Sequence, residues 1–420
     1  MLDAVVALIA LSCYSSIFAG DSPPVPGLKG TWTSDTSVLP NNLLPHVPIS
    51  GNGDLGIALS SVPWGPFQGP GIPSRGPGAQ CRNPDCSGPH HPGVNLWLGS
   101  NSMWGVYPAT RPSLGPAARA TRVHLGGSSI VLGNAFATAV SPAFRAEQHI
   151  ANGLLATSHI SPHANFTTTT RIHPQRNLLV TTCDWVPLSS STDKPFNITV
   201  STWTYERMQG YNPHHGGLNP GQMWPLIAPT ASGISKSGTG QAVQWVARTT
   251  TPYNVSSPHP VRAALATAVT WAEGDSVKVL ETDSYTPDEN NLVAEALTTL
   301  ELWTGRTASF VVTTALALEF PDVINTSVAT LVQEAIEDVT APAAQLDKVV
   351  AASDKWWSQF WSRSRVSLPS QPAIENMWLG SQYVLACAAS TDPRVPAPGL
   401  FGPWVTWDVN GWNGDYTLGL

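Results

Sequence analysis

The chain has 420 residues, a formal net charge of −7 at pH 7 and only 12% charged residues. This length can hold two or three average domains, or one large β-sandwich with part of a further unit. The acidic balance and the lack of a long basic run argue against nucleic-acid binding and against electrostatic docking on an anionic membrane. The 35 Gly and 38 Pro residues favour strands joined by tight turns over a helical bundle.

Residues 2–19 form an apolar segment that ends in small side chains, which is typical of a signal peptide. The segment departs from the usual pattern because it carries Asp3 and no Lys or Arg before its apolar core. An uncleaved anchor is the alternative, since the segment is close to the shortest length that spans a bilayer. We expect residues 1–20 to be a signal peptide. The mature protein is then secreted or extracellular, or lysosomal or vacuolar, with no membrane association after cleavage.

Sequons for N-glycosylation agree with export, although such short motifs also arise by chance. Four Asn-x-Ser/Thr sequons are predicted glycosylation sites, and they begin at Asn165, Asn197, Asn254 and Asn325.

A pair of closely spaced cysteines predicts a local disulfide. Cys81 and Cys86 bracket the turn-forming insert Arg-Asn-Pro-Asp, and disulfides are expected in an exported protein. His90 and His91 follow closely, so a Cys/Cys/His metal site is the alternative, although the spacing matches no structural zinc pattern. We expect the disulfide, no metal and no cofactor.

After a Pro-rich lead-in at residues 21–46, the sequence is typical of β-structure up to about residue 320. Segments rich in Val, Thr and aromatic residues alternate apolar and polar side chains and are separated by turn residues. Many antiparallel strands over residues 47–320 predict a large two-sheet sandwich. The clearest predicted strands are 177–185, 196–205, 242–247, 263–271, 276–280 and 306–316.

The sequence changes character near Pro321. Residues 321–352 are a predicted helical linker, because the pattern of residues 328–350 indicates two helices that are broken near Pro342. The two cysteines outside the predicted disulfide and the leader, Cys183 in a strand and Cys387 in a helix, are expected to be buried thiols.

Residues 353–420 begin a further helical unit. Ser353 is a predicted N-cap for the segment that follows it. Trp356 with Phe360 and Trp357 with Trp361 are i,i+4 pairs, which stack on one side of a helix, so we place Trp356, Trp357 and Trp361 in the core.

A last predicted helix starts with Ser370 as its cap and Pro372 in its first turn, and it runs to about Ala389. Its side chains at helical spacing are Ile374, Met377, Trp378, Ser381 and Leu385.

The C-terminal run of residues 401–420 places three Trp, two Asp and two Asn among small residues. Indole faces stack on the C–H faces of sugar rings, and carboxylates and amides pair with the hydroxyls at the ring edge. This composition predicts contact with carbohydrate.

Several motifs occur in a fixed order along the chain. Two lie near the N-terminus, Gly51-Asn52-Gly53-Asp54-Leu55-Gly56 and the segment 96–104. Four lie in the helical part, at residues 357–369, 378–383, 398–405 and 412–418. Together these motifs resemble the six-hairpin glycosidases, and the closest group is glycoside hydrolase family 95 (α-L-fucosidase-like), with family 65 as a relative.

The resemblance implies an N-terminal β-supersandwich, a helical linker and an (α/α)6 barrel that carries the active site. The expected fold class is therefore mainly β followed by α, and residues 353–420 supply only the first few helices of the barrel. The family's general acid and the carboxylate that activates its catalytic Asn lie farther downstream than residue 420. No catalytic residue is carried over, and we expect the chain as given to be inactive.

Three residues near the C-terminus are predicted to bind the substrate. Trp404 and Trp412 offer stacking faces, and the resemblance places Asp415 just before the family's catalytic Asn segment. Each has a second interpretation, because the two Trp side chains could pack where barrel and sandwich meet, and Asp415 could cap a helix. For the loop Gly51–Asp54, a turn is favoured over contact with substrate.

The sequence is consistent with three hypotheses about function. The chain is the N-terminal part of a secreted glycoside hydrolase that needs the remainder of its own barrel domain, or a family 65-like glycoside phosphorylase, or a non-catalytic β-sandwich module. In each case the predicted partner is carbohydrate, an oligosaccharide or glycan.

Overall fold

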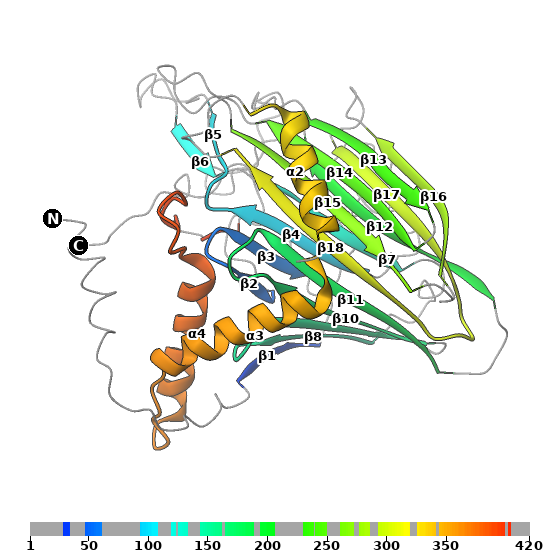
Figure 1. Cartoon of the computed structure of the whole chain (residues 1–420). Helices are drawn as coiled ribbons and strands as arrows, with labels where there is room; N and C mark the ends of the chain where they lie inside the picture. Colours follow the sequence, from blue (N-terminus) through cyan, green and yellow to red (C-terminus); the bar gives the residue numbers. More distant parts are fainter. Residues whose placement is uncertain are drawn as a thin grey trace, which may run out of the picture.

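The described residues of the computed structural model are 28–33, 47–60, 93–107, 119–122, 125–132, 143–161, 164–188, 194–205, 230–238, 240–249, 261–272, 277–285, 293–319, 326–341, 344–399 and 402–404. They form two large antiparallel sheets followed by three helices (Figure 1). The predicted order of β-structure before α-structure is confirmed.

One sheet has nine antiparallel strands among the described residues. Their spatial order is β1 (Lys29–Trp32), β8 (Ala143–His149), β9 (Leu154–Ile160), β10 (Ala164–Ile172), β11 (Leu178–Pro187), β18 (Ala308–Leu318), β15 (Arg262–Thr270), β14 (Gln241–Thr249) and β13 (Thr230–Gly238).

The other large sheet has seven strands in the described part of the chain, and a separate ribbon has two. The seven strands are, in spatial order, β16 (Lys278–Tyr285), β17 (Val293–Trp303), β12 (Pro195–Tyr205), β7 (Gly126–Leu132), β4 (Gly93–Ser100), β3 (Leu55–Ser60) and β2 (Ile49–Gly51). The ribbon pairs β5 (Trp104–Tyr107) with β6 (Arg119–Arg122).

The main core lies between the two large sheets, as period-two alternation requires. In β10, for example, Phe166 and Ile172 point inward while Asn165 and Thr169 lie on the other face. The buried Thr168 on the inward face is satisfied, because its hydroxyl pairs with that of Thr157 on β9 at 2.6 Å. The six strands named from the sequence all occur, with ends that differ by a few residues.

Helix α2 (Val328–Thr340) covers the outer face of the nine-stranded sheet. It packs Leu331 and Ala335 against an alanine-rich surface formed by β14, β15 and β18. Small side chains on these strands let the helix approach the sheet closely. Its N-cap is Ser327, whose hydroxyl accepts the N–H of Thr330.

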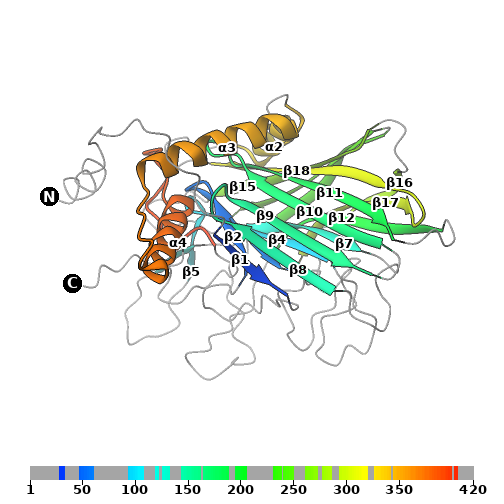
Figure 2. The same cartoon turned by 90° about the horizontal axis from the view of Figure 1, so that it is seen from below.

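Helix α3 (Leu346–Arg363) crosses β10 and β11 at the end of the same face (Figure 2). The predicted break near Pro342 is confirmed, because α2 ends at Thr340 and α3 starts at Leu346. The prediction that Ser353 caps a helix is wrong, since Ser353 lies inside α3 and is 2% exposed. It belongs to a buried stripe with Val349 and Trp357 at i,i+4 spacing, which keeps the helix continuous.

The aromatic pairs predicted on α3 are confirmed. The rings of Trp356 and Phe360 are stacked with centroids 5.5 Å apart, and those of Trp357 and Trp361 are stacked at 6.1 Å. Trp357 also stacks on Tyr383 at 5.1 Å, which joins α3 to the next helix.

Helix α4 (Pro372–Ala388) stands at one end of the sandwich, next to β2 (Figure 1). Its N-cap is Gln371, one residue after the predicted Ser370, and Pro372 occupies the first turn as predicted. The side that contacts the sandwich carries Leu379, Tyr383 and Cys387.

The apolar side chains that the sequence placed at helical spacing along α4 face outward and do not pack on the sandwich. Its exposed large side chains are Ile374 (50%), Met377 (69%), Trp378 (44%) and Leu385 (57%). Both sides of α4 are apolar, so spacing indicated a helix without indicating which side packs.

Other predictions have mixed outcomes. Cys183 and Cys387 are buried free thiols, as predicted.

Among the described helices, none combines the length and apolar character that crossing a bilayer requires. The predicted signal segment 1–20 and the sites Cys81, Cys86, Asn254, Asn325, Trp412 and Asp415 lie outside the described residues.

Candidate functional site

The first motif loop, Gly51–Gly56, is a tight turn where the sandwich meets the helices. The side-chain oxygen of Asn52 accepts the backbone N–H groups of Asp54 (3.0 Å) and Leu55 (2.8 Å), which closes the turn. Gly53 adopts φ of +94°, a conformation that residues with a Cβ rarely adopt. The turn that the sequence favoured is therefore present.

This turn is bonded to the C-terminal end of α4. The N–H of Gly53 donates to the carbonyl of Cys387 at 3.0 Å. The side chain of Asn101, which follows β4, donates to both Gly53 O (2.6 Å) and Ala388 O (2.7 Å). A Cβ at position 53 would lie 2.5 Å from the carbonyl oxygen of Ala389, so only glycine permits this approach.

Trp404 closes the same joint from the C-terminal side. Its indole is 6% exposed and its ring N–H donates to Ser50 O at 2.9 Å. It belongs to a buried cluster that includes Trp361 and Tyr383. The structure thus accounts for Trp404 by packing, and its role in sugar stacking stays an untested prediction.

The other side of the loop holds the turn between β10 and β11. The amide of Asn52 donates to Arg176 O (2.8 Å) and His173 O (3.2 Å). The amide of Asn177 donates to the carboxylate of Asp54 at 2.7 Å. The residues 173–177, here called the hairpin turn, are therefore fixed by the motif loop.

Asp54 is a buried carboxylate with all its partners supplied by the protein. It is 5% exposed and, besides Asn177, it accepts from Ser100 Oγ (2.6 Å), Ser102 Oγ (2.9 Å) and Ser102 N (3.2 Å). Four donors compensate for its removal from water, so Asp54 positions the segments around it.

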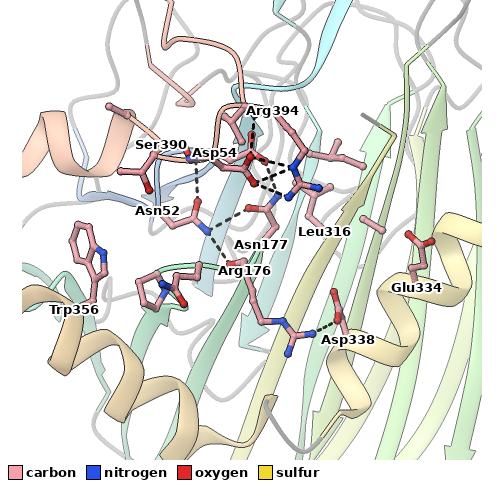
Figure 3. A pocket seen from close by; sticks show the side chains of 18 residues that line it. Asn52, Asp54, Arg176, Asn177, Leu316, Glu334, Asp338, Trp356, Ser390 and Arg394 are labelled. Atoms are coloured by element: carbon pink, nitrogen blue, oxygen red, sulfur yellow. Dashed lines mark hydrogen bonds and ion pairs between the residues drawn. The ribbon is translucent and has the colours of Figure 1, made fainter. Parts of the chain in front are cut away.

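A cleft of about 610 Å³ opens between the motif loop, the hairpin turn, α2, α3 and the segment that follows α4 (Figure 3). This volume falls within the range of ligand pockets. Most of its lining side chains are polar, and Trp356 adds an aromatic surface. The polar and charged ones are Asn52, Asp54, Gln175, Arg176, Asn177, Glu334, Asp338, Ser390, Thr391, Asp392 and Arg394.

Two ion pairs lie in the wall of the cleft. Arg176 from the hairpin turn pairs with Asp338 of α2. Arg394 binds Asp392 with two nitrogens, Nε to Oδ1 at 3.1 Å and NH2 to Oδ2 at 2.6 Å. The side-chain and backbone hydrogen bonds from Arg394 lower the pKa of Asp392 to about 2, so this carboxylate is ionised at neutral pH.

One histidine lies beside the cleft. Burial, and then the charge of Arg176, lower the pKa of His173 below its ordinary value of 6.5. Its Nδ1 accepts the N–H of Gln175 at 3.2 Å, as a neutral ring permits. His173 therefore shapes the hairpin turn as an uncharged group at neutral pH.

Trp356 supplies the aromatic surface of the cleft. It is half-buried, and its ring is fixed by the stack on Phe360 and by an edge contact with Trp357 at 4.8 Å. The sequence placed Trp356 in the core together with Trp357 and Trp361. Only the latter two are buried, at 4% and 3% exposed, so the placement of Trp356 is corrected.

Sequence reasoning also missed the charged residues of the cleft. Arg176, Asp338 and the Asp392/Arg394 pair come from three separate segments, and no local motif links them. The one local signal was the Asp-x-Arg spacing directly after the last predicted helix. Within the described ranges, no group of three or more His, Cys, Asp or Glu side chains could hold a metal ion.

Comparisons with known proteins give only distant structural similarity. No family model matches the chain, and no curated protein matches it. Among solved structures, a putative kojibiose phosphorylase from the human microbiome is 12% identical, with a TM-score of 0.45 over 81% of this chain and 39% of that chain.

Two family GH92 structures are also similar. A GH92 family glycosyl hydrolase is 8% identical, with a TM-score of 0.35 over 88% of this chain and 42% of that one. The family GH92 α-mannosidase from Bacteroides thetaiotaomicron is 10% identical, with a TM-score of 0.30 over 85% and 40%. The chain spans about two fifths of the length of each of these proteins. All three TM-scores are below 0.5, so the similarity assigns no activity to this chain.

Proposed function

We propose that this chain is the sandwich-and-linker part of a carbohydrate-active enzyme, a secreted glycoside hydrolase of the α-L-fucosidase type, and that it binds glycan in the cleft beside the motif loop. The observation that carries this proposal is the combination in one cleft of a rigid, half-buried indole and a polar wall.

The indole of Trp356 suits a sugar ring. Sugars present C–H groups on their faces, and these stack on aromatic rings. Because Trp356 is already immobilised by Phe360 and Trp357, binding costs little additional side-chain entropy.

The polar wall suits the ring edge. Each sugar hydroxyl both donates and accepts, so it needs carboxylates and guanidinium or amide groups side by side. The pairs Arg176–Asp338 and Arg394–Asp392 provide such neighbours. These side chains are held in place by one another before any ligand binds.

The convergence of the sequence motifs supports the proposal from a second direction. The resemblance to glycoside hydrolase family 95 rested on segments that are far apart in the sequence. Three of them meet at one joint through Gly53 to Cys387, Asn101 to Ala388 and Trp404 to Ser50. Shared use in one structural unit is what a common fold would require of such motifs.

The cleft is proposed to bind sugar without supplying the general acid. Glycoside hydrolysis usually needs a carboxylic acid of raised pKa opposite a second carboxylate. Asp392 has a lowered pKa, Asp338 is ion-paired and Asp54 has four donors around it. These three carboxylates favour binding over proton donation, which also keeps open a non-catalytic sugar-binding module.

The binding experiment uses calorimetry with L-fucose, methyl α-L-fucoside and disaccharides of glucose and mannose. We expect binding by the chain, and about fivefold weaker binding by Trp356→Ala, since an aromatic contact contributes about 1 kcal/mol. Trp378→Ala is the matched control, because Trp378 is exposed on α4 and does not line the cleft. Failure of the folded chain to bind any sugar would refute the proposal.

The catalytic experiment uses nitrophenyl α-L-fucoside and residues 21–420. We expect no measurable hydrolysis by this chain. Robust turnover would show that the catalytic groups lie within it and that the assignment of the cleft to binding alone is wrong.

Export is part of the proposal. Among the sequons in described segments, the side chain of Asn197 is exposed on β12, whereas that of Asn165 is half-buried and accepts from Ser158 Oγ at 3.0 Å. Expression with residues 1–20 in a secretory cell should give a glycosylated product in the medium. A decrease in mass on enzymatic deglycosylation that is smaller by one glycan in the Asn197→Gln variant would identify this site.

A further inference from the structure

The charges of the cleft are unbalanced among the described residues that line it. Carboxylates outnumber guanidinium groups by four to two. The carboxylates are Asp54, Glu334, Asp338 and Asp392, and the guanidinium groups are Arg176 and Arg394.

The two arginines are already committed to carboxylates. Arg176 pairs with Asp338, and Arg394 binds Asp392 through two nitrogens. An anionic ligand would have to compete with these intramolecular partners for each guanidinium group. The cleft is therefore poorly suited to an acidic or phosphorylated sugar.

Two negative charges remain without a cationic partner in the described part of the chain. The hydrogen-bond donors around the Asp54 carboxylate are all neutral groups. Glu334 is exposed on α2 and has neither an ion pair nor a hydrogen bond to another described residue. Figure 3 shows Glu334 and Asp338 on the same helix, across the cleft from Trp356.

An indole adds to the preference for a cation. The face of a Trp ring attracts an ammonium group electrostatically, and the attraction increases when the site is shielded from water. Trp356 thus favours both a sugar ring and a positive charge carried on it.

We propose that this cleft selects amino sugars, whose ammonium group is cationic, over neutral and acidic sugars. This inference rests on the proposed function and names the ligand class of the same cleft. The unpaired Glu334 carboxylate is the specificity-determining group, because it is free to pair with an ammonium group without first losing a partner.

The test compares four probes of the same linkage by calorimetry. They are the disaccharides of glucosamine, of N-acetylglucosamine, of glucose and of a hexuronic acid. At about pH 6 the glucosamine amines are protonated. We expect the glucosamine probe to bind about fivefold more tightly than the acetylated and neutral probes at low salt, and the hexuronate to bind most weakly. The advantage should shrink at about 0.5 M salt, because exposed charges are screened.

Glu334→Gln should remove most of this advantage, because it should weaken the binding of the glucosamine disaccharide more than that of the glucose disaccharide. Glu337→Gln is the matched control, since Glu337 is also exposed on α2, bonds to Gln333 and does not line the cleft. Both variants change exposed side chains and should unfold at the temperature of the parent chain.

The outcomes separate this inference from the proposed function. Equal affinity for the amino and acetylated probes would overturn the charge preference and leave sugar binding intact. Tighter binding of the hexuronate would also overturn it. No binding of any probe by the folded chain would refute the proposed function itself.

Discussion

The side-chain amide of Asn177 donates a hydrogen bond of 2.7 Å to the carboxylate of Asp54. This contact joins the hairpin turn of the nine-stranded sheet to the motif loop between β2 and β3 of the other sheet. The same carboxylate reaches Ser100 and Ser102 at the end of β4. One buried charge therefore fixes three segments at the edge of the cleft.

Replacement of Asp54 by Asn should destabilise this joint. The variant brings a second amide group toward that of Asn177 and removes a charged acceptor from several donors. We expect the free energy of unfolding, measured with urea, to fall by about 2 kcal/mol. Asp347→Asn, at a site whose side chain is 72% exposed, should change it by less than about 0.5 kcal/mol. An unchanged stability of Asp54→Asn would mean that the carboxylate is not needed to hold the turn.

Gly53→Ala should be destabilising and Gly380→Ala should not. Position 53 combines φ of +94° with a backbone oxygen 2.5 Å from the added Cβ, so we expect a loss of about 2 kcal/mol or more. Position 380 lies within α4 and has open space around the added Cβ. There, alanine should raise the free energy of unfolding by about 0.5 to 1 kcal/mol through helix propensity. Equal effects at the two positions would contradict the geometry of the joint.

His159 should make the stability depend on pH. It is 1% exposed beside Phe144, with ring centroids 5.1 Å apart, and burial lowers its pKa from 6.5 to about 4. Because the folded pKa lies below the unfolded one, this contribution is complete above pH 6.5 and is lost as the pH falls toward 4. The shift corresponds to about 3 kcal/mol.

The measurement is urea unfolding at several pH values between these limits. His159→Leu should flatten the dependence, because the group that takes up the proton is absent. If the parent chain and the variant lost stability in parallel between pH 6.5 and 4, the protonation of His159 would not be the cause.

The outward side of α4 should bind apolar dyes and favour aggregation. Met377 and Trp378 are 69% and 44% exposed, and the one charged residue of the helix, Glu375, is buried and accepts the N–H of Leu368 at 2.7 Å. We expect the double variant Met377→Gln and Trp378→Gln to lower anilinonaphthalene sulfonate fluorescence and light scattering. Its free energy of unfolding should stay nearly constant.

Leu379→Ala provides the contrast on the same helix. Leu379 is 1% exposed, so its truncation should cost about 2 to 5 kcal/mol of unfolding free energy. A parent chain that is monomeric in light scattering and binds no dye would show that the outward side of α4 is not the exposed surface described above.

Local patterns were sufficient where the signal was local. The period-two alternation of residues 196–205 predicted a strand, which is β12, and the i,i+4 spacing in α3 predicted the stacks of Trp356 on Phe360 and of Trp357 on Trp361. Local patterns failed where one residue fitted two positions in a helix equally well. Ser353 has the chemistry of an N-cap and yet lies inside a helix, since a buried stripe runs through it.

The cleft could not be predicted, because its parts have no fixed relation along the chain. Trp356 and Trp357 are adjacent and both are large aromatics, but one faces the cleft and the other the core. The rotation of α3 about its own axis decides which of the two side chains faces the cleft. That rotation is set by the packing of α3 on β10 and β11, which are distant from it in the sequence.

The sequence by itself determined the two-sheet sandwich, the helical character of the part after it and the turn in the first motif loop, because periodicity and the conformational freedom of glycine act over a few residues. The number of helices needed the structure, because residues 346–363 form one continuous helix. Only the tertiary structure shows that this loop forms hydrogen bonds with α4 on one side and with the hairpin turn on the other. Only the tertiary structure brings together the residues that line the cleft, among them Arg176, Asp338, Trp356 and Arg394. Those contacts join residues far apart in the chain, and they exist only once long-range packing has compensated for the entropy of bringing the segments together.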